Sequence, residues 1–179
     1  MHRRQPLPRL WLMTDERQGE GLWRALEKLP RGSGIVFRHY SLLEAERRQL
    51  FERVRGAAES RGLVLVLAGP PALAADWGAD GSHGWEGAGQ STLSTSLSVH
   101  DAAEMRAANR LKPDLVFVSP VFETRSHPGN PSLGIEGLNA LAELATMPVV
   151  ALGGMNEERA RMLTHPNIHG WAAVDAWSG

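Results

Sequence analysis

Short apolar runs recur along the chain, and segments with a helical pattern separate most of them. Eight runs have the length and composition of buried strands, and they cover residues 10–13, 34–37, 63–67, 78–82, 93–97, 115–118, 149–152 and 171–174. Continuous apolar strands that alternate with helices are typical of a parallel sheet with both faces covered. Eight such units predict an α/β fold closed into a TIM (β/α)8 barrel.

Three of the intervening segments carry clear helix signals, at residues 42–61, 99–111 and 157–163. Ser41, either Ser98 or Asp101, and Asn156 are the respective N-cap candidates, since their side chains can accept a hydrogen bond from the first turn. Gly62 is suited to end the first of these helices, because glycine readily adopts a left-handed conformation.

The predicted barrel is compact and occupies residues 1–179 as one domain. The helix after the fourth strand is expected to be reduced, because residues 86–91, which follow Trp85, are too few for a full helix. The helix after the eighth strand is expected to be missing. An open doubly wound sheet is the alternative, but no Gly-x-Gly-x-x-Gly sequence follows the first strand.

Composition limits the classes of function. Of 179 residues, 42% are hydrophobic and 22% charged, and the net charge is −1, so nothing indicates affinity for nucleic acid or an anionic membrane. No apolar run is long enough to span a bilayer, and no signal peptide is recognised. Without cysteine there is neither a disulfide nor thiolate chemistry, and a cytoplasmic location is expected.

Two strand ends are followed by sequences suited to binding an anion. The loop after residues 115–118 is rich in hydroxyl, cationic and glycine residues, and the strand at 149–152 ends in two consecutive glycines. Hydroxyls and backbone N–H groups of this kind bind phosphate, and barrels bind ligands at the carboxyl ends of their strands. The phosphate-binding candidates are Ser119, Thr124, Ser126, Gly134, Gly153 and Gly154.

Three histidines are also predicted at strand ends, namely His39, His83 and His127. Imidazoles titrate near neutral pH and suit proton transfer, so His83 and His127 are catalytic candidates and His39 is a candidate for the same pocket. The three lack the sequence spacing of a zinc site, and no metal ligand is assigned. Ser98 and Trp85 are further pocket candidates.

Six segments together resemble the thiamine phosphate synthase family, also called thiamine-phosphate pyrophosphorylase, which includes the thiazole tautomerases. The segments are residues 10–15, Arg38, residues 78–83, Ser98 to His100 with Glu104, residues 119–124 and residues 152–155, in the order in which the family carries them. The resemblance covers nearly the whole chain.

The resemblance implies a TIM barrel that joins a thiazole phosphate to hydroxymethylpyrimidine diphosphate in thiamine biosynthesis. It also implies that Arg38 acts on the diphosphate, that the thiazole phosphate rests on glycine loops, and that two aspartates hold Mg²⁺. Here Ala68 and Gly69 occupy the first magnesium position, and the second falls among residues 86–88. Mg²⁺ is therefore expected from the family, but its ligands are absent from the sequence and no cofactor is assigned.

Other family positions also differ. The two lysines expected on the diphosphate are absent, with His127 in place of one of them, and Asp175 replaces a serine beside the thiazole phosphate. Pro120 stands where the tautomerases carry their catalytic histidine. The alternatives are a metal-independent tautomerase that uses other histidines and a non-catalytic barrel that binds a phosphorylated heterocycle. A homo-oligomer is expected if a partner covers the face left by the missing eighth helix.

Overall fold

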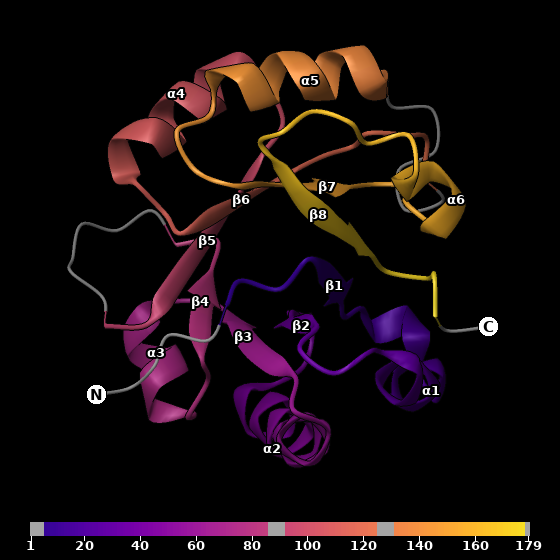
Figure 1. The fold of residues 1–179 in the computed structure, drawn as a ribbon. Helices are drawn as coiled ribbons and strands as arrows, with labels where there is room; N and C mark the ends of the chain where they lie inside the picture. Colours follow the sequence, from indigo (N-terminus) through magenta and orange to yellow (C-terminus); the bar gives the residue numbers. More distant parts are fainter. Residues whose placement is uncertain (1–5, 86–91, 125–130, 178–179) are drawn as a thin grey trace.

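The computed structural model describes residues 6–85, 92–124 and 131–177. Eight parallel strands follow one another around a closed barrel, and the last pairs with the first (Figure 1). The strands are β1 (Leu10–Met13), β2 (Gly34–Phe37), β3 (Val64–Ala68), β4 (Gly81–His83), β5 (Ser94–Val99), β6 (Leu115–Val118), β7 (Val149–Leu152) and β8 (Ile168–Ala173). The predicted eight-stranded α/β barrel is confirmed.

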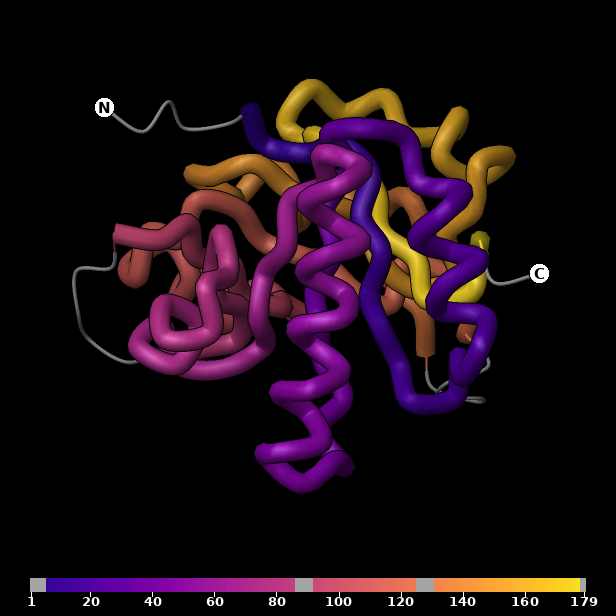
Figure 2. Tube along the Cα trace, turned by 90° about the horizontal axis from the view of Figure 1, so that it is seen from below, coloured from indigo at the N-terminus to yellow at the C-terminus, as the bar shows by residue number. Residues whose placement is uncertain are grey.

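Helices cover the outside of this barrel. They are α1 (Gly21–Lys28), α2 (Glu44–Arg61), α3 (Pro71–Asp76), α4 (Ala102–Leu111), α5 (Gly134–Leu144) and α6 (Glu157–Ala160), with a short 3₁₀ helix, η1 (Glu16–Gln18), after β1. The longest is α2, one end of which extends beyond the rest of the chain in Figure 2. None of the described helices is both long and apolar enough to cross a membrane.

Several element boundaries differ from the sequence-based expectation. The turn after α3 runs through Gly78, whose φ is +73°, and the Ala79 amide still bonds back to Ala74, so β4 starts at Gly81 and not at residue 78. The last strand, β8, starts earlier than expected, at Ile168. The eighth strand therefore begins with Ile168, His169 and Gly170, which do not form a continuous apolar run.

The helix caps were partly predicted. Asp101 and Asn156 accept hydrogen bonds from the amides of Glu104 and Arg159, each at 2.8 Å, as expected of N-caps. Gly62 ends α2 with φ +65°. Ser41 is not a cap, because its amide and hydroxyl both bond to Glu16, and α2 begins at Glu44.

Two other expectations concern helix bounds. Ser98 belongs to β5, so α4 starts at Ala102. The helix α6 ends at Ala160, beyond which the amides of Arg161, Met162 and Leu163 bond to carbonyls three residues back. The reduced helix expected between β4 and β5 falls on residues 86–91, outside the described residues.

Aromatic side chains fill the middle of the barrel. Trp11 and Phe117 meet edge to face with ring centroids 5.4 Å apart, and both are almost fully buried. Gly34 makes room for the indole, since a Cβ there would lie 2.2 Å from a Trp11 ring atom. The packed centre leaves space for ligands only toward the two ends of the barrel.

Candidate active site

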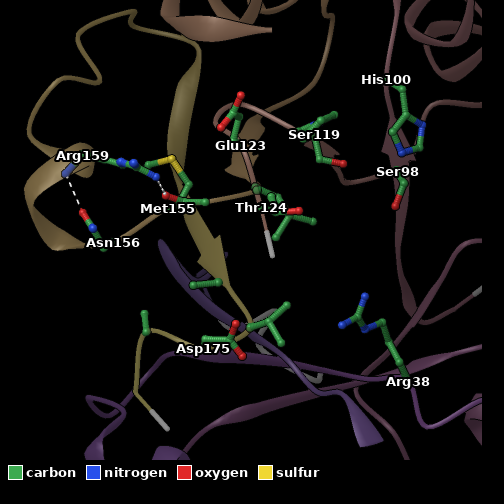
Figure 3. Close-up of a pocket in the computed structure, with 17 residues that line it drawn as sticks. Arg38, Ser98, His100, Ser119, Glu123, Thr124, Met155, Asn156, Arg159 and Asp175 are labelled. Atoms are coloured by element: carbon green, nitrogen blue, oxygen red, sulfur yellow. Dashed lines mark hydrogen bonds between the residues drawn. The ribbon is translucent and has the colours of Figure 1, made fainter. Parts of the chain in front are cut away.

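A cavity of about 650 Å³ opens at the carboxyl ends of the strands (Figure 3). Its polar lining comes from strand ends, loops and the first turn of α6, which are distant in sequence: Arg38, Ser98, His100, Ser119, Glu123, Thr124, Asn156, Arg159 and Asp175. The volume is in the range of sites that enclose a small ligand. The parallel strands bring these loops together because all eight end at the same rim.

The turn after β7 has a backbone that only glycine accommodates well. Gly153 has φ +97° and Gly154 φ +62°. A Cβ on Gly153 would lie 2.7 Å from Pro120 Cα, and one on Gly154 would lie 2.6 Å from the Glu123 carbonyl oxygen. The two residues thus let the β6 and β7 loops touch, and the Phe122 amide donates to the Gly153 carbonyl at 3.0 Å.

Arg159 is a cavity residue that the sequence reasoning missed. Asn156 caps the first turn of α6, and this places the Arg159 guanidinium over the Phe122 ring, 4.5 Å from its centroid. The guanidinium also donates to the Gly154 carbonyl. The sequence did contain a signal for Arg159, which lies three residues after the N-cap of a helix that follows a glycine turn. The first turn of such a helix lies beside the loop that precedes it, so a side chain there can reach the cavity.

Arg38 reaches the cavity from the end of β2, and its side chain is anchored. The Arg38 Nε donates to the Thr14 carbonyl at 2.7 Å, and one terminal nitrogen lies 3.4 Å from Asp15. The pKa of Asp15 is lowered to about 2, mainly by its hydrogen bond from Arg17 and further by the charge of Arg38. Figure 3 shows the guanidinium pointing into the cavity.

His83 lies inside the barrel and is not among the described residues that line this cavity. Its Nδ1 is 2.9 Å from the Ser96 hydroxyl and its Nε2 is 3.2 Å from the hydroxyl of Ser98, which does line the cavity. Burial lowers the pKa of His83 to about 4, and the charge of Arg38 adds to this. The ring is therefore neutral at neutral pH.

His39 is placed differently. Its ring stacks on Phe37 with centroids 4.8 Å apart, and its Nδ1 lies 3.0 Å from the Thr14 hydroxyl. The side chain is 5% exposed and does not line the cavity, and burial lowers its pKa. The expectation that His39 and His83 both face one shared cavity differs from the structure, because one ring packs at the ends of β1 and β2 and the other points into the barrel.

The remaining sequence candidates divide into three groups. Ser98, Ser119, Thr124, Gly153 and Gly154 line the cavity together with Arg38. Gly134 begins α5 and its amide donates to the Val121 carbonyl at 2.9 Å, while Trp85 is 51% exposed, and neither lines the cavity. Ser126 and His127 lie outside the described residues.

The described lining residues balance positive and negative charge. Arg38 and Arg159 are matched by Glu123 and Asp175. From the sequence, Asp175 was expected to replace a serine beside the thiazole phosphate, whereas Glu123 was not singled out. The balance means that an anion depends on local donors and not on a large positive field.

The described residues do not fit a Mg²⁺ site. β3 ends at Ala68 and is followed by Gly69, and β4 ends at His83. No group of three or more metal-ligating side chains occurs in residues 6–85, 92–124 and 131–177. Mg²⁺ prefers carboxylate oxygens, which these two strand ends lack among the described residues.

The sequence of this chain is similar to those of known proteins of one family. The sequence pattern of the family described as thiamine monophosphate synthase matches residues 10–177. A putative thiamine-phosphate synthase 2 of Aquifex aeolicus is 28% identical, over 94% of this chain and 96% of that protein. A thiamine-phosphate synthase of Syntrophomonas wolfei is also 28% identical, over 95% of this chain and 88% of its own length.

The fold agrees with a solved structure. The thiamine phosphate pyrophosphorylase of Pyrococcus furiosus superimposes with a TM-score of 0.75, covering 98% of this chain and 89% of that chain at 23% sequence identity. This likeness establishes the barrel architecture.

Proposed function

The chain belongs to the thiamine monophosphate synthase family, and from that premise we propose that it joins a thiazole phosphate to hydroxymethylpyrimidine diphosphate. The observation that carries the proposal is the cavity in which the β7 glycine turn, Ser119 and Arg38 meet at one rim. The two substrates are small phosphorylated heterocycles, and the cavity is large enough to hold heterocycles of this size.

The thiazole phosphate is assigned to the side of the cavity formed by the β6 and β7 loops. Gly153 and Gly154 bring backbone close to the ligand, and the Ser119 hydroxyl can donate to a phosphate oxygen. Arg159 adds a cation at the same turn. Thr124 lines the same side, and a phosphate role for Ser126 remains a prediction.

The pyrimidine diphosphate is assigned to the side that carries Arg38. The thiazole nitrogen attacks the methylene carbon, the carbon–oxygen bond breaks, and diphosphate leaves with the electron pair. Negative charge builds on the leaving oxygen, and a preorganised guanidinium stabilises it. The anchoring of Arg38 by Thr14 and Asp15 fixes that donor before the reaction. The coupling of a thiazole without a carboxyl group transfers no proton.

Diphosphate release tests this proposal. Purified protein is mixed with both substrates, and diphosphate and thiamine phosphate are quantified together. We expect Arg38→Ala to lower the rate by about 10²–10³-fold, as for loss of one charge-stabilising group. Arg161→Ala is the matched control, because Arg161 is an exposed arginine that pairs with Glu157 and does not line the cavity. Absence of diphosphate release by the wild-type protein would refute the coupling reaction.

A second candidate function is supported by one observation, the contact of a buried neutral histidine with a cavity hydroxyl. His83 and Ser98 could move a proton on a thiazole phosphate tautomer, an isomerisation that needs no metal. Aromatisation of that tautomer without diphosphate release would favour this reaction. Thermal stabilisation by thiazole phosphate with no turnover in either assay would favour a binding protein. The cytoplasmic location and the homo-oligomer remain predictions.

A further inference from the structure

A second cavity, of about 590 Å³, lies at the opposite end of the barrel. It is lined by residues at the starts of the strands, including Trp11, Asp80, Ser96 and Asp114. The two carboxylates are held in place, because Asp80 accepts from the Leu65 amide and Asp114 from the Thr95 amide, each at 2.8 Å. The barrel therefore has one cavity at each mouth, called the upper cavity at the carboxyl ends and the lower cavity here.

A continuous row of three side chains joins these cavities. Ser98 lines the upper cavity, Ser96 lines the lower cavity, and His83 lies between them. His83 pairs with Ser96 in the register of β4 and β5, and Ser98 is two residues further along the same face of β5. The hydroxyls contact opposite nitrogens of the ring, at 2.9 Å for Nδ1 and 3.2 Å for Nε2.

The hydrogen bonds give this row a direction. The Ser96 hydroxyl lies 3.5 Å from the Ser82 carbonyl, to which it can only donate. Ser96 then accepts from the Nδ1–H of His83, and the unprotonated Nε2 accepts from the Ser98 hydroxyl. This arrangement makes three hydrogen bonds, whereas the opposite tautomer makes two and leaves the Ser82 carbonyl without its side-chain donor.

We propose that Ser98, His83 and Ser96 form a proton relay that connects the upper cavity with water in the lower cavity. A ligand in the upper cavity gives a proton to Ser98 as Ser98 passes its own to Nε2. Nδ1 simultaneously passes its proton to Ser96, while the hydroxyl proton of Ser96 turns from the Ser82 carbonyl toward the lower cavity and passes to water there. The ring stays neutral, the ligand loses one proton and water gains one. Passage in the other direction returns a proton and restores the starting arrangement.

This relay goes beyond the coupling reaction, which moves no proton when the thiazole lacks a carboxyl group. Two related conversions of thiazole phosphates require the transfer of a proton. A carboxylated thiazole that loses CO₂ after coupling must take up a proton at the vacated ring carbon. A thiazole tautomer must lose one proton and gain another to become aromatic. The relay rests on the proposed function and serves the thiazole phosphates of that function whose conversion moves a proton.

The first test needs no substrate. Nitrogen NMR of protein with labelled histidine distinguishes the two neutral tautomers of His83 at pH 7. We expect the Nδ1–H form in the wild-type protein. In Ser96→Ala the acceptor for this proton is lost, and we expect a change to the Nε2–H form, which donates to Ser98. An Nε2–H ring in the wild type, or the same tautomer in both proteins, would overturn the relay whether or not the coupling reaction occurs.

The second test separates proton transfer from structural support. His83→Gln keeps an amide that can hydrogen bond to both serines but cannot accept and hand on a proton. We expect it to slow aromatisation of the thiazole phosphate tautomer by about 10²-fold or more. Ser96→Ala should slow it comparably while the Kd for thiazole phosphate changes less than twofold. Ser94→Ala, which removes a lower-cavity hydroxyl outside the row, should retain the wild-type rate.

Two results of this second test would contradict the relay. One is full aromatisation activity in His83→Gln, which would make the imidazole only a structural support. The other is equal loss in Ser94→Ala and Ser96→Ala, which would show a general disturbance of the lower cavity. If the wild-type protein does not aromatise the tautomer at all, the relay has no ligand of this class and this assignment fails.

Discussion

The two sides of the upper cavity prepare for an anion in different ways. On the β6–β7 side, the site is formed by backbone geometry. Two glycines with positive φ let the loops pack closely, and Arg159 donates to the carbonyl of one of them, Gly154. On the β2–β4 side, one anchored side chain, Arg38, faces strand ends that carry Ala68, Gly69 and His83. The first side is suited to holding a phosphate that stays. On the second side, Arg38 is the cation that the described lining residues offer to a phosphate that leaves.

The largest effect is expected from filling the glycine turn. In Gly153→Ala the new methyl group meets Pro120 Cα at 2.7 Å and the backbone keeps an unfavourable φ. Strain of about 1–3 kcal/mol and overpacking of similar size should lower the free energy of unfolding by about 2–6 kcal/mol. Denaturant unfolding measures this loss, and calorimetry with thiazole phosphate should show at least tenfold weaker binding.

Gly84→Ala is the matched control for this substitution. Gly84 has φ +78°, but a Cβ there meets no atom of the described residues within 4 Å. It should show only the backbone strain, about 1–3 kcal/mol, with unchanged thiazole phosphate affinity. Equal losses of stability in the two variants would mean that loop contact at the β7 turn is unimportant.

Removing one cation from each side should separate the two anion sites. We expect Arg38→Ala to reduce the coupling rate about 10²–10³-fold with little change in thiazole phosphate affinity. Arg159→Ala should instead weaken thiazole phosphate binding by about 10-fold or more, as for loss of a hydrogen bond to a charged group. Binding calorimetry and diphosphate release are measured on both proteins. A reversed pattern would exchange the two assigned sides.

Acid should lower the free energy of unfolding through His83, which lies at the end of β4. Its pKa is about 4 in the folded protein, below the ordinary 6.5, so the unfolded chain binds a proton first as pH falls. The contribution of the neutral ring is complete above pH 6.5 and is lost between pH 6.5 and 4, by about 3 kcal/mol. Unfolding curves across this range should show the loss in the wild type.

His83→Gln provides the comparison for this pH dependence, since glutamine does not titrate. Its stability should fall less over the same range, with a remainder from His39, whose pKa is also lowered by burial. Asp15 contributes only at lower pH, because its pKa is about 2. Parallel curves for the two proteins would show that folding does not lower the pKa of His83.

The smallest expected effect concerns the cap at the glycine side. Asn156→Ala removes the acceptor for the Arg159 amide and should cost about 1 kcal/mol of stability. Because α6 positions Arg159, thiazole phosphate binding should also weaken. Asp101→Ala removes an equivalent cap from α4, away from the glycine turn, and should cost similar stability with unchanged binding. If both variants bound thiazole phosphate with the same affinity, the Asn156 cap would have no influence on the anion site.

Much of the fold was predictable because its signals are local. Buried parallel strands are continuous apolar runs, and five of the eight have nearly the expected bounds, as at β2 (Gly34–Phe37) and β7 (Val149–Leu152). Asp101 and Asn156 were recognisable as caps, since a cap depends on a few neighbouring residues. The polar β4 gave no such run, so its start was misplaced.

The candidate site was predictable as a set of loops but not as a set of contacts. The rim position of Arg38, Ser119, Gly153 and Gly154 follows from the parallel order of strands. The orientations of His39 and His83 were not predicted correctly, because a shift of one position along a strand turns a side chain to the other face. Arg159 was missed because its contacts come from the way that α6 folds back on the loop.

By itself the sequence determined the alternation of strands and helices, the glycine turn after β7 and the family of the chain, since each depends on residues that are neighbours or on an ordered series of motifs. Only the tertiary structure decided which side chains face the upper cavity and that His83 lies between Ser96 and Ser98. The physical reason is that closure of the barrel sets the register between β4 and β5, and register fixes which side chains meet.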